Sequence, residues 1–378
     1  MTNPLRQLTL DQLRRRTTEK WRAYPADVLP LFVAEMDVPL AEPIVRAVSN
    51  ALELGDSGYP AGTGYADALA DFARKRWGWD GVVAERTRVV PDVMFGLAEA
   101  LRLVGRDGDP VVVNSPVYPP FYDLIRHLGR QVVESPLGAD GRLDLEGLAT
   151  TFEQHEHAAY LLCNPQNPTG TVHTREELEA VATIAGEHGV RVVVDEIHAP
   201  LVLPGADFVP YLSISGTADA FSAISASKGW NLAGLKAALL SGGNDTVAEL
   251  ASLPLLVTDG ASHIGIHAHV AALRDGGDWL DALVAGLDDN RRLLGTLLAE
   301  SLPSVRYRPP AATYLAWLDC RELDLGDDPA AVFLDRGRVA LNSGPDFGTG
   351  GAGHVRLNLA TSPEIVTEAV RRIAVSLG

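Results

Sequence analysis

Lys228 is the residue of this chain whose surroundings point most directly to chemistry. It lies in the segment 225–235, which reads SASKGWNLAGL and follows a short apolar run at 221–224. Taken alone, a lysine is most often a solvated surface residue. Among hydroxyls and glycines directly after a buried strand, however, a long cationic side chain has no evident packing role. A lysine amine that loses its proton is a nucleophile, so Lys228 is a candidate for covalent catalysis.

Three further polar segments also lie directly after or within an apolar run. The segment 164–170 reads NPQNPTG, 195–198 reads DEIH, and Arg356 interrupts the apolar segment 354–359, HVRLNL. Each segment also has a purely structural alternative: an ordinary turn for 164–170, a helix cap for 195–198, and a buried ion pair with an acid for Arg356. An arginine within an apolar strand nevertheless needs an anionic partner, and a bound ligand can supply one.

The spacing of the apolar residues indicates how these segments are positioned. Compact apolar runs predict buried strands, and amphipathic stretches between them predict helices. We expect strands at 111–114, 160–163, 191–195, 221–225 and 237–241, and helices at 94–104, 121–128 and 174–188. Such alternation favours an α/β fold with a mostly parallel sheet, whose ligands bind beyond the carboxyl ends of the strands.

The last hundred residues predict a different arrangement. A long helix is expected at 279–302, strands at 314–318 and 354–359, and a final helix at 363–377 that Thr361 or Ser362 caps. This pattern indicates a smaller α+β domain that begins near Gly276.

Taken together, the four polar segments resemble those of the fold-type I pyridoxal 5′-phosphate (PLP) enzymes, the aminotransferase class I/II superfamily. Four other segments resemble its bacterial C–S lyase branch, the aminotransferase-like cystathionine β-lyases: 31–37 (LFVAEMD), 59–60 (YP), 115–121 (SPVYPPF) and 342–348 (NSGPDFG). The resemblance implies a three-layer, aspartate aminotransferase-like large domain and a smaller α+β domain. We expect an N-terminal segment at 1–40 that joins the small domain, the large PLP-binding domain at 41–276 and the small domain at 277–378.

The resemblance also implies roles for the residues around the coenzyme ring. Lys228 matches the lysine that bonds PLP covalently and then serves as general base. Asp195 matches the aspartate that pairs with the pyridine nitrogen, and Tyr118 the aromatic residue that stacks on the ring. Asn167 matches the asparagine that donates to the phenolic oxygen, and His198 occupies the place of a tyrosine near that oxygen in many aminotransferases.

A second group matches the residues that hold the coenzyme phosphate. Ser225 and Ser227 offer hydroxyls, and the helix that begins at Val93 and Met94 offers backbone N–H groups. Lys236 stands where many relatives have an arginine, and a lysine binds phosphate as a point charge rather than bidentately.

The remaining implied contacts concern the substrate and a second subunit. Arg356 matches the arginine that clamps the α-carboxylate of an amino acid, with Asn167 and Ala34 beside it in the substrate site. Tyr59 matches a tyrosine that reaches the phosphate of the neighbouring subunit, which implies a homodimer with shared active sites.

The resemblance to the C–S lyase branch implies α,β-elimination from cystathionine or another cysteine S-conjugate, with release of pyruvate, ammonia and a thiol. The alternative within enzymes is an aminotransferase that passes the amino group to a 2-oxo acid. A regulatory protein that keeps the fold without catalysis is the alternative outside enzymes, and the presence of Lys228, Asp195 and Arg356 argues against it.

Composition limits the classes of partner. Lys and Arg total 32 and Asp and Glu total 49, so the formal charge is 32 − 49 = −17, which disfavours nucleic-acid binding. No run reaches the roughly 18 apolar residues of a membrane span, and the first residues have no signal-peptide pattern. We expect a cytoplasmic protein with a small-molecule substrate. Cys163 and Cys320 are too few for a disulfide framework.

Two weaker patterns do not predict binding sites. The segment 348–353 fits G-x-G-x-x-G but precedes a strand near the C-terminus, which is the wrong context for a dinucleotide site. His263, His267 and His269 cluster, and the first two share a helical face. No acid or cysteine near them in the sequence completes a ligand set, so we expect no metal site.

Overall fold

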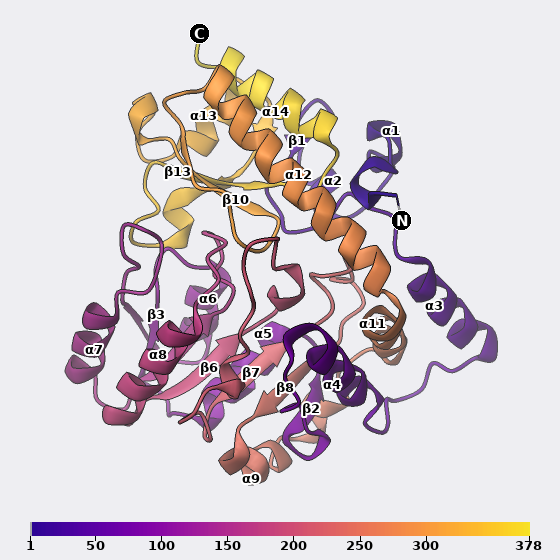
Figure 1. Ribbon diagram of the computed structural model, residues 1–378, viewed down its shortest axis with the longest axis vertical. Helices are drawn as coiled ribbons and strands as arrows, with labels where there is room; N and C mark the ends of the chain where they lie inside the picture. The colour runs from indigo at the N-terminus through magenta and orange to yellow at the C-terminus, as the bar shows by residue number, and fades with distance from the viewer. Residues whose placement is uncertain (1) are drawn as a thin grey trace.

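A seven-stranded sheet forms the centre of the larger part of the molecule (Figure 1). The structure is a computed structural model that describes residues 2–378. The strand order is β2-β8-β7-β6-β5-β3-β4, and only β8 runs antiparallel to its neighbours. The strands are β2 (Thr87–Val90), β3 (Pro110–Val113), β4 (Gln131–Glu134), β5 (Ala159–Cys163), β6 (Arg191–Asp195), β7 (Phe221–Ile224) and β8 (Ala238–Gly242). The predicted mostly parallel sheet is confirmed, and its five predicted strands lie within two residues of their observed bounds.

The register of the central strands explains why the polar segments meet. Cys163 pairs with Asp195 across β5 and β6, and Asp195 pairs with Ala223 across β6 and β7. The three strands are parallel, so their carboxyl ends reach the same edge of the sheet. The loops that contain Asn167, His198 and Lys228 begin at this edge.

Helices cover both faces of the sheet, as three-layer packing requires. One face packs against α5 (Val93–Leu103) and α6 (Pro120–His127), and the other against α7 (Leu145–Gln154) and α8 (Arg175–Glu187). Successive side chains of strand β5 point to opposite faces of the sheet, and both faces are covered. Leu161 lies in one apolar cluster, and Leu162 lies in the other. The predicted capping box of α8 is present, since Thr174 and Glu177 bond each other's backbone N–H groups.

A group of helices that the sequence analysis did not predict lies beside this sheet. Helices α3 (Glu42–Leu54) and α4 (Gly64–Trp77) both pack against α11 (His263–Asp275). Two short helices, α9 (Val247–Ala251) and α10 (Leu255–Thr258), precede α11. Gly55 ends α3 with a φ of 73°, a left-handed conformation that glycine adopts without strain, and the chain then turns towards α11.

The smaller part of the molecule is an antiparallel sheet with helices packed on it. Its strand order is β12-β13-β10-β9, and the long helix α12 runs beside α14 across it (Figure 1). Ser362, rather than Thr361, caps α14. The elements are α12 (Gly277–Ser301), β9 (Arg306–Tyr307), β10 (Leu315–Asp319), α13 (Pro329–Asp335), β12 (Asn342–Ser343), β13 (His354–Asn358) and α14 (Pro363–Val375).

The first forty residues pack against this smaller part. Strand β1 (Leu29–Pro30) pairs in parallel with β11 (Val339–Ala340). The short helices α1 (Leu10–Leu13) and α2 (Glu19–Arg22) contribute Leu13 and Trp21 to an apolar cluster that includes strands β10 and β13. The proposed domain limits at residues 40 and 276 stay predictions.

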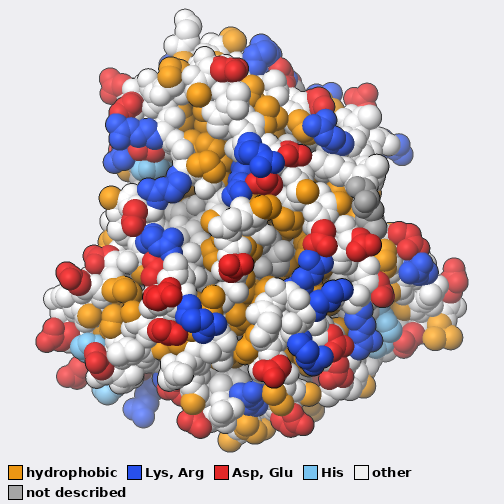
Figure 2. Space-filling view, in the orientation of Figure 1, with side chains coloured by type: hydrophobic (Ala, Val, Ile, Leu, Met, Phe, Trp, Pro, Cys, Tyr) orange, Lys and Arg blue, Asp and Glu red, His pale blue; other side chains and the backbone are white. Residues whose placement is uncertain are grey.

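The visible surface bears charges of both signs. Figure 2 shows acidic and basic side chains interspersed over one face rather than gathered into a continuous basic stripe. Within residues 2–378, no helix is long and apolar enough to cross a membrane.

Candidate active site

A cavity lies at the carboxyl edge of the seven-stranded sheet, where the sequence analysis places the chemistry. Its empty volume is about 750 Å³, and its walls come from the N-terminal segment, from α5 and from the loops after β3, β5, β6 and β7. Most of the predicted coenzyme and substrate residues line it: Ala34, Val93, Met94, Tyr118, Asn167, Asp195, His198, Ser227, Lys228 and Lys236.

The Lys228 amine lies within this cavity and is held by a single backbone acceptor. Its Nζ donates to the carbonyl of Ala34 at 3.0 Å. Burial, together with the positive charge of Arg356, lowers the pKa of Lys228 to about 8, and the Asp195 carboxylate opposes this shift. A larger fraction of this amine than of an ordinary lysine is therefore unprotonated near neutral pH, as a nucleophile or general base requires.

Asp195 ends strand β6 and is 5 % exposed. One carboxylate oxygen accepts the Ile197 N–H at 3.0 Å. Burial raises the pKa of Asp195 to about 6, although the Ile197 N–H and the Lys228 charge lower it. The carboxylate thus lacks a full counter-charge in the protein, and a cationic ring nitrogen in the cavity would supply one. The adjacent Glu196 faces elsewhere, since it accepts the Tyr211 N–H at 2.8 Å.

Aromatic and imidazole rings form further walls of the cavity. Tyr118 lines it with its ring edge-on to Phe121, at a centroid distance of 5.7 Å. His198 is buried edge-on to Tyr314 at 6.0 Å, and its Nδ1 has no hydrogen-bond partner within the described chain. Burial, followed by the charges of Lys228 and Arg356, lowers the pKa of His198 well below its ordinary value, so the ring is neutral.

The N-terminus of α5 provides a site suited to an anion. Val93 and Met94 line the cavity in the first helical turn, whose N–H groups have no acceptors within the helix. Asp92 caps the helix by accepting the Phe95 N–H at 2.8 Å, and it also pairs with Lys236 Nζ at 2.7 Å. Lys236 therefore stands at the same corner as the helix terminus, where Asp92 balances its charge and the Val93 and Met94 N–H groups remain for an anion.

The two predicted serines differ in position. Ser227 lines the cavity, but Ser225 does not. The buried Ser225 hydroxyl donates to the carbonyl of Ala237 at 2.8 Å and accepts the Ser227 N–H at 3.1 Å. In this structure the Ser225 hydroxyl stabilises the turn between β7 and Lys228, and its predicted contact with the phosphate stays a prediction.

Arg356 is 3 % exposed on strand β13, and each of its protein partners is neutral. It donates to Asn167 Oδ1 at 2.9 Å, to Asn342 Oδ1 at 2.6 Å and to the Phe32 carbonyl at 3.2 Å. Its Nε is buried without a partner in the described chain. The alternative of an ion pair with an acid does not hold within residues 2–378, where no carboxylate lies within ion-pair distance.

Burial lowers the pKa of the Arg356 guanidinium to about 10, although the nearby Tyr118 and Tyr314 raise it. A buried cation without a counter-ion is costly to the fold. Such a group is retained where an anionic ligand completes its surroundings. Arg356 itself does not line the cavity, but Asn167 does, and its side-chain oxygen accepts a hydrogen bond from Arg356.

The N-terminal segment completes the cavity from the side of the smaller sheet. The Ala34 carbonyl accepts both Lys228 Nζ and the Tyr314 hydroxyl, the latter at 2.9 Å. Asn231 holds the next turn by bonding both the N–H and the carbonyl of Met36. Tyr59 lies outside this cavity with 84 % of its surface exposed, and its predicted role in a neighbouring subunit stays a prediction.

Three contributors were missed in the sequence. Asp92 lines the anion corner, and the Asp-x-x pattern before an apolar helix was an available N-cap signal. Tyr314 and Asn342 contact the Ala34 carbonyl and Arg356 from the smaller sheet. No local pattern marks these two, because they reach the site only when the two parts of the chain pack together.

The donor set fits PLP on structural grounds. An amine with a lowered pKa stands near a buried carboxylate that lacks a counter-charge, and an aromatic wall and a helix N-terminus with a lysine are present in the same cavity. These match the aldehyde, the ring nitrogen, the ring face and the phosphate of the coenzyme.

Comparison with known proteins agrees with this chemistry. Residues 39–373 match the family model of aminotransferase class I and II. A Mycobacterium tuberculosis protein, provisionally named cystathionine β-lyase, is 54 % identical over 99 % of this chain and 98 % of its own length. Cystathionine β-lyase of Corynebacterium glutamicum is 36 % identical over 97 % of this chain and 98 % of its own length. The PLP-bound C–S lyase of Staphylococcus hominis superposes with a TM-score of 0.89, at 25 % identity and 96 % coverage of both chains.

The chain therefore belongs to the aminotransferase class I and II family of PLP-dependent enzymes. Within that family its relatives include proteins named cystathionine β-lyase and C–S lyase, as the predicted resemblance implied. The aspartate aminotransferase-like fold is confirmed as well.

Proposed function

We propose that this enzyme is a carbon–sulfur β-lyase that cleaves cystathionine or another cysteine S-conjugate to pyruvate, ammonia and a thiol. The observation that carries the amino-acid specificity is the buried Arg356, which has only neutral protein partners, one of them the cavity-lining Asn167. The names of the relatives support elimination over transamination.

Arg356 binds the α-carboxylate of the substrate in this proposal. A guanidinium fork and a carboxylate form two parallel charge-assisted hydrogen bonds, and the ion pair relieves the cost of the buried cation. Asn167 orients the fork because it accepts from Nη1 on the cavity side. The substrate Cα is thereby held at a fixed distance from the anchoring group.

Lys228 moves the proton. Bound PLP acts as an electron sink for the substrate Cα, which makes the Cα proton acidic. Lys228, with its lowered pKa, accepts that proton as general base. The Ala34 carbonyl holds the amine in place beforehand, so little reorganisation is needed.

Asp195 and the surrounding rings set the environment for this step. The buried Asp195 carboxylate stabilises a positive charge on the ring nitrogen. Tyr118 lines the cavity where it would pack on the ring of bound PLP, and the neutral His198 adds no competing charge beside Lys228.

We further propose that two copies of the chain share their active sites, with Tyr59 as the residue each lends to the other. Tyr59 and Leu54, which are 84 % and 81 % exposed, flank the turn after α3. A large apolar exposure of this kind is typical of a protein interface. Sedimentation equilibrium tests the dimer. A Tyr59→Phe variant tests the contact, because it should bind PLP more weakly while remaining dimeric.

Pyruvate release tests the lyase. Purified enzyme with cystathionine should form pyruvate and ammonia without any 2-oxo acid. Lys228→Ala should abolish the reaction, and replacement of the exposed Lys75 by Ala should not. If product forms only when a 2-oxo acid is supplied, the enzyme is an aminotransferase and the proposal is wrong.

A further inference from the structure

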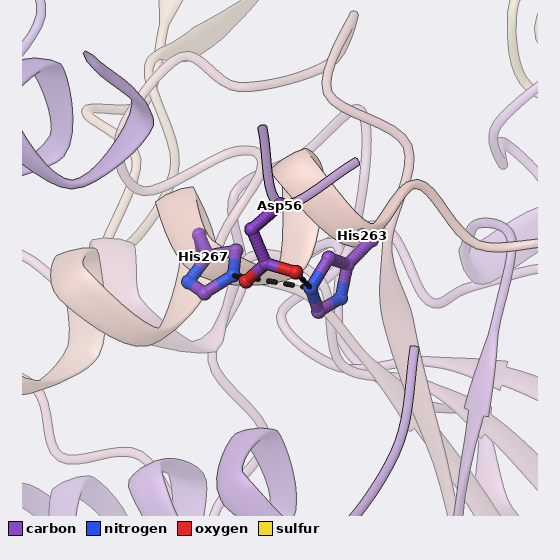
Figure 3. A group of neighbouring side chains, drawn as sticks. All are labelled: Asp56, His263 and His267. Carbon is purple, nitrogen blue, oxygen red and sulfur yellow. Dashed lines mark hydrogen bonds and ion pairs between the residues drawn. The ribbon is translucent and has the colours of Figure 1, made fainter. Parts of the chain in front are cut away.

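Three potential metal ligands meet outside the active site, on the surface between α3 and α11. Figure 3 shows the Asp56 carboxylate between the rings of His263 and His267, with one oxygen towards each ring. Asp56 Oδ1 lies 3.3 Å from His263 Nε2, and Asp56 Oδ2 lies 3.2 Å from His267 Nε2. The two Nε2 atoms are 3.2 Å apart. Asp56 is distant in sequence, so the sequence analysis could not place this acid beside the histidine pair.

These separations match those between the ligand atoms of a tetrahedral metal site. Zinc binds imidazole nitrogen and carboxylate oxygen at about 2.0–2.1 Å, so neighbouring ligand atoms of a tetrahedron lie about 3.3–3.4 Å apart. Octahedral coordination at the same bond length would place adjacent ligands about 2.9 Å apart. The three observed distances lie nearer the tetrahedral value.

The local backbone holds the ligands in this arrangement. His263 and His267 are one turn apart on α11, so their rings project from the same face. Asp56 directly follows Gly55, whose left-handed conformation ends α3 and directs the chain to α11. In the single chain the side chain of Asp56 is 43 % exposed and that of His267 is 37 % exposed, which leaves a side open for a fourth ligand from water. Asp56 lies between Leu54 and Tyr59, so in the proposed dimer this opening lies next to the subunit interface.

Hydrogen bonds account for this cluster only through one shared proton, since His267 Nε2 lies 3.2 Å from both Asp56 Oδ2 and His263 Nε2. A cation at the centre accepts a lone pair from all three atoms at once. When Nε2 of His263 binds the metal, the ring proton lies on Nδ1. This nitrogen is buried without an acceptor in the described chain, so an unsatisfied N–H is the cost of metal binding.

We propose that Asp56, His263 and His267 form a site for a divalent transition metal, zinc by preference, with water as the fourth ligand. Two imidazoles and one carboxylate suit this ion, whereas magnesium and calcium favour all-oxygen sites. The metal would join the turn after α3 to the first turn of α11. The Ser262 N–H that precedes His263 donates to the Lys236 carbonyl at 2.8 Å, so the same helix terminus also supports the wall of the PLP cavity.

Calorimetric titration of the chelator-treated holoenzyme with zinc chloride tests this site. One zinc ion should bind per chain, and X-ray absorption should show two imidazole ligands at about 2.0 Å. In other metal sites, loss of a hydrogen bond that supports a metal ligand already weakens metal binding by about tenfold or more. Loss of a ligand itself should weaken it at least as much, so His263→Gln and His267→Gln should each raise the Kd for zinc by more than about tenfold. Zinc should also raise the Tm of the wild type and leave that of both variants unchanged.

His127→Gln is the matched control, because His127 is an exposed histidine at the end of α6, outside the cluster. It should bind zinc as the wild type does. Asp56→Asn provides a third variant on an exposed turn, and the yellow coenzyme absorption shows that each variant is folded. The proposal is overturned if the wild type takes up no zinc, or if the two histidine variants bind it with wild-type affinity.

Discussion

Replacement of Arg356 by Gln should reduce kcat/KM for cystathionine by about 10²–10⁴-fold. The two charge-assisted hydrogen bonds to the substrate carboxylate contribute about 1.5–3 kcal/mol each, or about 3–6 kcal/mol together. Each 1.36 kcal/mol corresponds to roughly a tenfold change in rate. Arg356→Lys keeps the charge but loses the fork, so a decrease of about 10–100-fold is expected for one lost bond.

The same substitution should stabilise the protein. Burial lowers the pKa of Arg356 from 12.5 to about 10. The charged form is therefore disfavoured in the folded state by about 3 kcal/mol at neutral pH, at 1.36 kcal/mol per pKa unit. Arg356→Gln removes this cost, although part of the gain is offset by the loss of bonds to Asn342 and Phe32. Urea unfolding should show a higher midpoint for the variant.

Continuous measurement of pyruvate gives kcat/KM, and the coenzyme absorption shows that PLP remains bound. Arg338→Gln is the matched control, because this arginine is exposed, pairs with Asp27 and lies outside the cavity. It should leave kcat/KM unchanged. A decrease below tenfold in Arg356→Gln would refute the assignment of this residue as the carboxylate clamp.

Three other perturbations follow from the site. Burial raises the pKa of Asp195 from 3.8 to about 6, so the folded apoprotein binds more protons than the unfolded chain between these values and loses stability as pH rises through this window. Apoprotein with Asp195→Asn should therefore unfold at higher urea than wild type at pH 8, and the difference should vanish near pH 4; an equal difference for the exposed Asp123→Asn would contradict this reasoning. Burial lowers the pKa of Lys228 to about 8, so the rate of PLP uptake by apoprotein should rise with pH through a midpoint near 8 and level off about one pH unit higher, and a midpoint near 10 in stopped-flow absorbance would disprove it. Lys236→Gln should weaken PLP binding by only about fivefold, since the lysine is 58 % exposed, and a loss above a hundredfold in equilibrium dialysis would show a buried contact instead.

The central strands and most of the coenzyme site could be predicted from local patterns. Apolar runs predict β5, β6 and β7, and parallel pairing places Asn167, Asp195 and Lys228 at one edge whatever the details of packing. These predictions depend on residues close in sequence. The roles attached to each residue were implied by the family resemblance and were not derivable from spacing.

Other parts of the site depend on side-chain direction and on distant contacts. Ser225 and Ser227 are indistinguishable as hydroxyls in the sequence, but only Ser227 lines the cavity. Arg356 indicated a missing anion, while its neutral partners Asn167 and Asn342 come from other strands and loops. Asp56 meets His263 only because α3 packs on α11, and no local pattern predicts that contact.

Residues 31–37, here called the strap, are held at the coenzyme cavity by side chains of β13, far along the chain. Asn358 Nδ2 donates to the carbonyls of Val33 and Glu35 at 2.8 and 2.7 Å, and Arg356 donates to that of Phe32. During synthesis the strap emerges first and its anchors emerge last, more than three hundred residues later. A nascent chain halted before β13 therefore has the lysine but lacks the bonds from Arg356 and Asn358 that hold the strap on either side of Ala34. Acquisition of the yellow colour would accordingly require translation through β13, and a chain truncated before Arg356 should retain vitamin B6 poorly.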